Sequence, residues 1–338
     1  MPKLVLFDPS MRDNSGTQSP NLGDVLIHYA VISEIRQLAP AYKIVRVSTH
    51  VPVESEMTSE LSSCSIGVVG GSNLLGNRWL IWHKLKLFRQ WKLSLAAASC
   101  APPTVLLGVG WTQYQGKPDP HNRSLLDKLL ARDMIHSVRD DYTKEKLECI
   151  GITNIVNTGC PTLWPLVERR CRGEPQEKSD VVLTMLTDYS KHPISDRRLL
   201  ILLKRCYRHV IFWPQGENDL KYVSKLCVKI EPLERTLDAL GQFVTTNQCD
   251  YIGTRLHGGI YCLLRGVRSL ILGIDNRALE MKRSINLSVL PRNDFKGIQR
   301  WIKGPTISDL RIDTCAIDQW RSAFKDWCMH MAESSGVL

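Results

Sequence analysis

The sequence predicts an α/β protein with two doubly wound parallel-sheet domains, and three observations support this fold class. Short apolar runs typical of buried strands alternate with segments whose apolar residues recur at helical spacing. The connections between strands are too long for hairpins, so the strands should run parallel. The chain has 338 residues, which is enough for two hydrophobic cores. A polar stretch at 171–180 predicts a linker, so we expect domains at 1–172 and 173–312, and a final helical segment, 313–338, that packs back on the first domain.

The first domain should begin with a strand and continue as alternating strands and helices. Apolar runs bounded by turn residues predict strands at 3–7, 42–47, 66–69, 104–109, 134–138 and 152–156. Apolar residues at helical spacing predict helices at 25–38, 74–98 and 124–132, and a further one after Asp141.

The predicted helix at 74–98 has an unusual composition. Tryptophan and phenylalanine residues alternate there with lysine and arginine, and no acidic residue occurs from Leu61 to Pro118. A basic aromatic helix of this kind can lie on an anionic membrane surface. Alternatively, its aromatic face packs on the domain core and its charges are solvated.

The second domain is expected to continue the alternation of strands and helices after the linker. Strands are expected at 181–186, 210–213, 228–230, 251–253 and 269–274. Helices are expected at 197–207, around Leu220, at 233–245 and 256–265, with a last helix within 308–337.

Composition narrows the class of protein. The chain is 43% hydrophobic and 23% charged, as in ordinary soluble globular proteins, and its eleven cysteines form no Cys-x-x-Cys pair that would indicate a zinc or thioredoxin site. The formal charge of +10 predicts attraction to an anion, although no nucleic-acid-binding motif is present. There is no signal-peptide pattern and no apolar run long enough to span a bilayer, so we expect a cytoplasmic protein with reduced thiols.

The segment after the strand at 251–253 carries the strongest functional signal. Thr254, Arg255 and His257 lie between the end of this strand and the start of a helix, where unpaired backbone N–H groups favour an anion. Arginine offers a planar fork to a carboxylate or phosphate, and histidine can move a proton at neutral pH. Gly258 allows a ligand to approach the first turn. Alternatively, Arg255 and His257 only cap neighbouring carbonyls and carboxylates.

Two turns of the first domain also follow strands. Asn21 and Asp24 come between the first polar loop and the first helix, where they either face a ligand or serve as helix caps. Gly70 and Gly71 end the third strand and allow close backbone contact with a phosphate or sugar, and Asn73 follows them.

Arg139 stands at the carboxyl end of another strand. It either faces the ligand or forms a pair with Asp140 or Asp141 of little energetic weight. In the second domain, residues 214–217 end a strand and are expected to line the same ligand site.

Five segments in chain order resemble the motifs of the polysaccharide pyruvyl transferase family: 21–24, 70–73, 137–140, 254–258 and 274–277. The departures are Ser72, in a run that is usually glycine, and Arg277, where the family more often has lysine. The resemblance implies two Rossmann-like domains facing a cleft in a GT-B-like arrangement, with the acceptor on the first domain and the donor on the second. It also implies transfer of the enolpyruvyl unit of phosphoenolpyruvate to two sugar hydroxyls, giving a pyruvate ketal and phosphate.

The resemblance assigns roles to the predicted site. Arg255 and Arg139 would hold the carboxylate and phosphate, His257 would protonate the methylene carbon, and Asp24, from the opposite domain, would accept a hydroxyl proton. Substrate-binding positions would be Arg139, Asn21, Gly70, Gly71, Asn73, Thr254, Leu256 and Gly258.

We expect no metal and no cofactor besides phosphoenolpyruvate as the donor. The acceptor would be a saccharide of a surface glycan or its lipid-linked precursor, at the inner face of the membrane. The alternatives are a GT-B glycosyltransferase that uses a sugar nucleotide, or a catalytically silent glycan-binding member.

Overall fold

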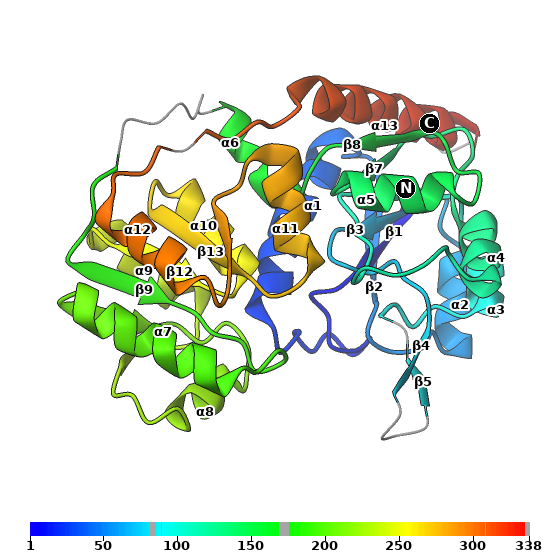
Figure 1. The fold of residues 1–338 in the computed structure, drawn as a ribbon. Coiled ribbons are helices and arrows are strands. Elements are labelled where there is room, and N and C mark those ends of the chain that lie inside the picture. The colour runs from blue at the N-terminus through cyan, green and yellow to red at the C-terminus, as the bar shows by residue number, and fades with distance from the viewer. Residues whose placement is uncertain (82–85, 89, 169–175, 308, 335–338) are drawn as a thin grey trace. The chain divides into compact units, whose positions relative to one another are not determined.

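The computed structural model describes residues 1–81, 86–88, 90–168, 176–307 and 309–334 (Figure 1). The chain forms two compact units. The first comprises Met1–Ser19, Ile27–Trp164 and Ile312–Leu338, and the second comprises Pro20–Leu26 and Pro165–Arg311. Each unit contains a parallel sheet, which confirms the predicted α/β class. Among the helices of the described ranges, none is both long and apolar enough to cross a bilayer.

The first unit is built on a four-stranded parallel sheet in the order β2-β1-β3-β6. A parallel pair, β7 and β8, is joined to the segment after β6 by a bridge between Val109 and Val138. The strand order reverses between β1 and β3, and ligands of such sheets bind outside the carboxyl ends at this point. The strands are β1 (Lys3–Asp8), β2 (Lys43–Ser48), β3 (Ile66–Gly70), β6 (Thr104–Leu107), β7 (His136–Val138) and β8 (Ile155–Asn157).

The helices of the first unit include the last one of the chain, α13. The Tyr42 hydroxyl donates to the Cys328 carbonyl (2.8 Å), and the Trp164 ring lies 6.0 Å from Trp320. The C-terminal segment is thus grouped with the first unit, and its aromatic residues are buried there. The first turn of α1 is grouped with the second unit. The helices are α1 (Leu22–Leu38), α2 (Ser55–Ser62), α3 (Leu95–Cys100), α4 (Pro120–Leu129), α5 (Asp141–Glu148), a 3-10 turn (Pro161–Leu163) and α13 (Thr314–Ser334).

The predicted helix at 74–98 is wrong. Strands β4 (Trp79–Ile81) and β5 (Lys86–Phe88) form an antiparallel pair instead, and α3 begins only after the Ser94 cap. Aromatic and β-branched residues favour a strand, and in this short segment that preference prevails over the helical spacing. Trp91 is buried against Phe7, as the core alternative requires. Residues 82–85 and 89, which carried much of the membrane hypothesis, lie outside the described residues, so that hypothesis stays a prediction.

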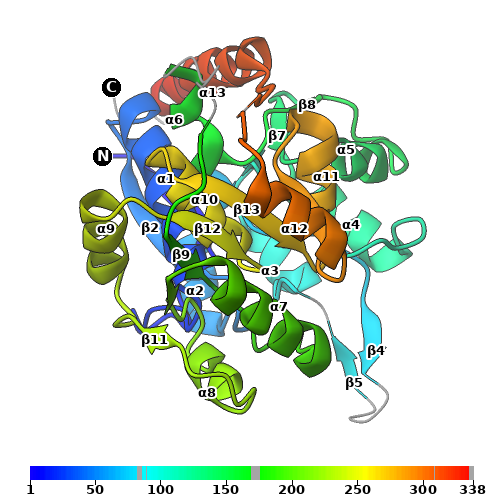
Figure 2. The same ribbon diagram turned by 60° about the vertical axis from the view of Figure 1, so that its left-hand side comes forward.

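The second unit is built on a six-stranded, wholly parallel sheet in the order β11-β10-β9-β12-β13-β14. Alternate residues of its central strands face opposite sides: Ile252 and Leu270 pack in the core beside α7, whereas Tyr251 and Ile271 flank Gly259 of α10. Helices therefore cover both faces of this sheet, as Figures 1 and 2 show. The strands are β9 (Val181–Thr184), β10 (His209–Phe212), β11 (Glu231–Pro232), β12 (Asp250–Gly253), β13 (Arg268–Gly273) and β14 (Val289–Pro291). The helices are α6 (Pro165–Glu168), α7 (Pro193–Cys206), α8 (Asp219–Ser224), α9 (Leu237–Thr246), α10 (Leu256–Leu264), α11 (Asn276–Ile285) and α12 (Phe295–Lys303).

A buried histidine connects β7 to the rest of the first core. The Nδ1 atom of His136 accepts the Leu106 N–H (3.3 Å), so its Nε2 must donate to the Ala131 carbonyl (2.9 Å) and the ring is neutral. Burial lowers the pKa of His136 from 6.5 to about 4, although the Ala131 carbonyl and Asp133 favour the proton.

This histidine should make stability depend on pH. In the unfolded chain it takes up a proton below pH 6.5, whereas in the fold it does so only near pH 4. The free energy of unfolding should therefore fall by about 3 kcal/mol as the pH drops through this range. Urea titrations at intervals between pH 7 and pH 4 measure the effect. His136→Gln should abolish this component, and the exposed control His209→Gln should retain it; an equal slope in both variants would contradict the assignment.

Candidate active site

The predicted residues of the second unit gather at the carboxyl edge of its sheet, where the strand order reverses between β9 and β12. The Thr254 N–H donates to the Met185 carbonyl (2.8 Å), which ties together the segments that leave these two strands. Helix α10 begins directly afterwards at Leu256, and His257 is its second residue, with 5% of its surface exposed. A Cβ at Gly258 would meet the flexible end of the Met185 side chain, so a larger residue there would force Met185 to move.

Arg255 is held by carboxylates that the sequence analysis did not identify. Its Nε donates to Oδ2 of Asp219 (2.9 Å), its Nη2 donates to Oδ1 of the same carboxylate, and Asp188 lies 3.5 Å from Nη2. The guanidinium also lies over the Tyr189 ring, 5.2 Å from its centroid. Only 4% of Arg255 is exposed. The fork of Arg255 is thus oriented by Asp219, a contact of the kind that the structural alternative describes.

Asp219 is itself fixed from several sides. It accepts the N–H groups of Gly216 (2.7 Å) and Asp188 (3.0 Å) besides the arginine. Burial raises the pKa of the Asp219 carboxyl, and the charge of Arg255 acts in the opposite direction. The pair is thus a buried ion pair whose two members depend on each other.

Gln215 connects α10 to the turn that precedes α1. Its Oε1 accepts the Gly258 N–H (3.0 Å), its Nε2 donates to Oδ1 of Asn21 (2.8 Å), and its carbonyl accepts the Leu22 N–H (3.0 Å). Asn21 also accepts the Gly23 N–H (3.2 Å), so it caps α1 as well. The 214–217 segment thus contacts the predicted site.

Asp24 lies in this second-unit group, whereas the sequence analysis expected it on the opposite domain. Its negative charge reaches Arg277, which forms a close pair with Asp275 (Nη2 to Oδ2, 2.6 Å) and a hydrogen bond to the Tyr189 hydroxyl. Burial on its own would lower the pKa of Arg277, but Asp275, Tyr189 and Asp24 raise it above its ordinary value. Tyr189, which no motif had indicated, thus contacts both arginines of this edge.

In the first unit, the structure brings Arg139 and Asn73 together. The guanidinium is buried, its Nη2 donates to Oδ1 of Asn73, and its Nε lies 3.5 Å from Oδ2 of Asp140. Nε and Nη1 have no hydrogen-bond partner within the described part of the chain. A Cβ at Gly110 would collide with this guanidinium. The buried cation is thus paired with Asp140, and Nη1 is the donor that it keeps for a further acceptor.

Gly70 and Gly71 have a packing role in the structure. Cβ atoms built on them would meet Val31 and Ile27 of α1, and Gly71 has a positive φ of 66°. These contacts explain both glycines through the seating of the helix on β3. Within the described ranges, no group of three or more His, Cys, Asp or Glu side chains is placed to hold a metal ion.

Comparisons with known proteins bear on this geometry. No curated protein matches the sequence. Among solved structures, the chain is similar to the wall teichoic acid polymerase TagF (9% identity, 98% of this chain and 82% of that one, TM-score 0.42). It is also similar to the UDP-GlcNAc 2-epimerase from Neisseria meningitidis bound to UDP-GlcNAc (12%, 98% and 99%, TM-score 0.44) and to LpCGTa in complex with UDP (11%, 97% and 94%, TM-score 0.42).

A family model describes most of the chain. The model for polysaccharide pyruvyl transferase matches residues 21–276, which begin at the Asn21 turn and end at the Asp275 pair. The match includes the turns that carry Arg139, Arg255 and His257. The chain belongs to the polysaccharide pyruvyl transferase family.

Proposed function

We propose that the protein transfers the enolpyruvyl unit of phosphoenolpyruvate to two hydroxyls of a sugar in a surface glycan or its precursor. The observation that carries this proposal is the convergence of three motif segments at one sheet edge. The 21–24 turn is connected to α10 through Gln215, and it reaches Arg277 through Asp24. Three sequence segments far apart in the chain thus lie together in a member of this family, which supports the proposal.

The reaction needs an acid, a base and groups that hold a dianion. Protonation of the methylene carbon by His257 makes the central carbon electrophilic, so that a sugar hydroxyl adds there and forms a C–O bond. Asp24 is proposed to accept the proton of this first hydroxyl. Attack by a second hydroxyl then breaks the C–O bond to phosphate and closes the ketal, and the departing phosphate takes the second hydroxyl proton and leaves as hydrogen phosphate.

The arginines take different parts in this proposal. Arg139 is proposed to hold a carboxylate or phosphate oxygen, in competition with the Asp140 carboxylate and the Asn73 amide that contact its buried guanidinium in the first unit. Arg255 supplies positive charge to the edge but, because Asp219 holds its fork, it acts chiefly as a positioning residue for the start of α10. This assignment modifies the one implied by the resemblance, in which Arg255 grips the donor directly.

The test is phosphate release from phosphoenolpyruvate in the presence of the host's surface glycan or its lipid-linked precursors. We expect release that requires an acceptor, with a ketal-bearing product identified by mass spectrometry. Parallel reactions contain labelled sugar nucleotides in place of phosphoenolpyruvate. Transfer of label to the acceptor would assign a glycosyltransferase instead, and glycan binding without either reaction would assign a silent binding member.

A further inference from the structure

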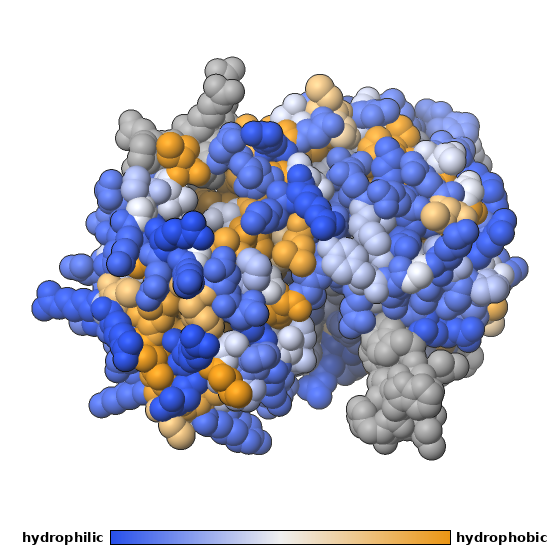
Figure 3. Space-filling model, viewed as in Figure 1, coloured by the Kyte–Doolittle hydropathy of each residue, from blue (hydrophilic) through white to orange (hydrophobic). Residues whose placement is uncertain are grey.

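One side of the second unit combines basic and apolar side chains. We define the α7–α8 face by Lys191, Ile194, Arg197, Leu220, Lys221 and Lys225. All six are exposed, and the two apolar side chains strongly so, at 74% for Ile194 and 43% for Leu220. Figure 3 shows hydrophobic residues gathered among hydrophilic ones over this part of the unit. Single exposed aliphatic side chains are common on protein surfaces, so the evidence for an interaction surface here is their combination with the surrounding basic charges.

The amino end of α7 and helix α8 form this face together because a buried tyrosine joins them. The Tyr222 hydroxyl accepts the His192 N–H (3.1 Å) and donates to Asp196 of α7. The Lys191 ammonium lies 6.0 Å from the centroid of the same ring. These contacts fix the two elements side by side, so Ile194 and Leu220 belong to one rigid surface.

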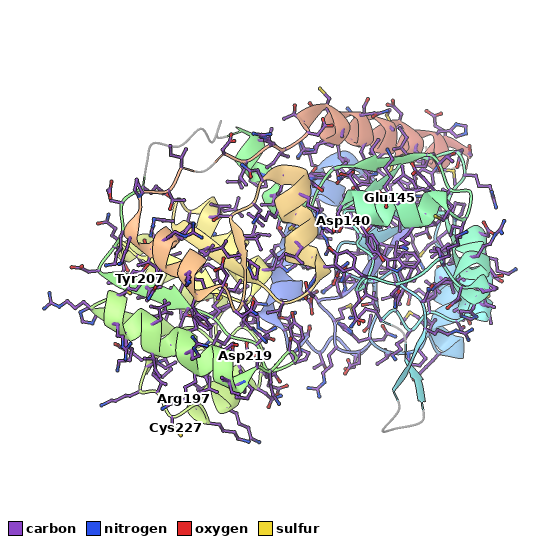
Figure 4. All side chains as sticks on the ribbon, in the orientation of Figure 1. Asp140, Glu145, Arg197, Tyr207, Asp219 and Cys227 are labelled. Atoms are coloured by element: carbon purple, nitrogen blue, oxygen red, sulfur yellow. The ribbon has the colours of Figure 1, made fainter. Side chains whose placement is uncertain are left out.

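The exposed side of α7 is mostly basic. Its buried residues include Leu199, Leu200 and Leu203, whereas Arg197, Arg198, Lys204 and Arg205 face solvent at helical spacing from Ile194. Between residues 189 and 230, the exposed charged side chains are all basic except Glu217, since the other two carboxylates, Asp196 and Asp219, are buried. Figure 4 shows Arg197 and Cys227 at the lower rim of the unit, outside Asp219. The face is therefore strongly positive.

We propose that the α7–α8 face docks on an anionic membrane surface. Lysine and arginine attract acidic headgroups, and Ile194 and Leu220 gain free energy by entering the boundary between headgroups and acyl chains. A nucleic acid would use the charges but offers no apolar layer for two aliphatic side chains.

The face adjoins the candidate active site. Helix α8 starts at Asp219, the carboxylate that orients Arg255, and the loop before α7 carries Asp188 and Tyr189, which contact the same guanidinium. Docking would hold this edge of the sheet near the headgroup layer, where a lipid-linked saccharide presents its hydroxyls. The choice of a lipid-linked acceptor rests on the proposed function, whereas the docking does not.

Sedimentation with vesicles tests the docking. The whole chain is mixed with phosphatidylcholine vesicles with or without phosphatidylglycerol, and we expect binding only to the anionic ones. Loss of one lysine charge near an anionic surface weakens binding by about fivefold, so Lys221→Glu with Lys225→Glu should weaken it by at least about 30-fold, since reversal adds to the loss. The matched control, Lys128→Glu with Lys325→Glu, changes the net charge equally on exposed residues of the first unit and should bind nearly as the parent does.

A second pair of variants separates a membrane from a purely electrostatic partner. Ile194→Asp with Leu220→Asp should weaken vesicle binding, and Ile194→Ser with Leu220→Ser should do so with no change of charge. The proposal would be overturned if the protein did not bind anionic vesicles. It would also be overturned if the lysine control variant lost as much binding as the face variants, or if the serine pair had no effect.

Activity assays keep this proposal distinct from the proposed function. With a water-soluble acceptor the face variants should release phosphate at the parent rate, and with a vesicle-embedded acceptor they should be slower. Vesicle binding without any phosphate release would support docking and overturn the proposed reaction. Phosphate release without vesicle binding would support the proposed reaction and overturn the docking.

Discussion

Arg255→Ala is expected to destabilise the second unit by about 3–5 kcal/mol, the usual cost of leaving one member of a buried ion pair without its partner. The Asp219 carboxylate would keep the Gly216 and Asp188 N–H groups but lose its only bidentate cation among the described contacts. Urea unfolding measures the loss. An unfolding curve identical to that of the parent would show that Asp219 is protonated or solvated rather than paired.

A compensated double variant separates stability from catalysis at this position. Arg255→Met with Asp219→Leu replaces the pair by apolar side chains, a change that is often neutral for stability. We expect it to recover most of the lost free energy while phosphate release stays low, because the positive charge beside α10 is absent. Arg255→Lys keeps the charge and loses the fork, so it should lie between the two. Full activity of the double variant would make Arg255 a purely structural residue.

His257→Gln is expected to lower kcat for phosphate release by about 10²–10⁴-fold, the contribution of a well-placed general acid. Glutamine keeps hydrogen-bonding capacity at a position where the side chain is 5% exposed, so the fold should persist. The measurement is the initial rate at saturating phosphoenolpyruvate, with urea unfolding in parallel to confirm the fold.

The exposed His209→Gln variant is the control for His257→Gln and should keep the parent rate. A kcat of His257→Gln within threefold of the parent would assign the proton to another group.

The unit around the active site was predicted closely from the sequence. Its strands and helix, expected at 251–253, 256–265 and 269–274, lie at Asp250–Gly253, Leu256–Leu264 and Arg268–Gly273. These elements are buried in the fold, so their periodicity is set by the core and is visible in the sequence.

Other elements could not be predicted in this way. Helices α2 and α11 are polar and were not expected, and the strand expected at 228–230 lies at Glu231–Pro232. Helix α12 was also not expected, although Phe295, Ile298 and Ile302 recur there at helical spacing. In α11, Asp275 caps the helix and also pairs with Arg277, roles that only the folded turn makes apparent. A strand of two residues at the edge of a sheet carries almost no pattern of its own.

The residues that contact the candidate catalytic residues come from distant parts of the sequence. Asp219 lies 36 residues before Arg255, and Tyr189 lies 88 residues before Arg277. The distance between two residues in the sequence cannot predict such a contact. Their positions after parallel strands of one sheet place them at the same edge. The place of each at a strand's carboxyl end was the only available signal.

The amide of Gln215 affects how a substitution of Asn21 must be interpreted. One side chain spans the amino end of the helix that carries His257 and the asparagine that starts α1, so the two cannot shift separately. Altering Asn21 will therefore disturb the seating of the imidazole as well as any contact with a sugar. A mutational scan that scores Asn21 by acceptor affinity alone will mistake a displaced proton donor for a lost hydroxyl contact.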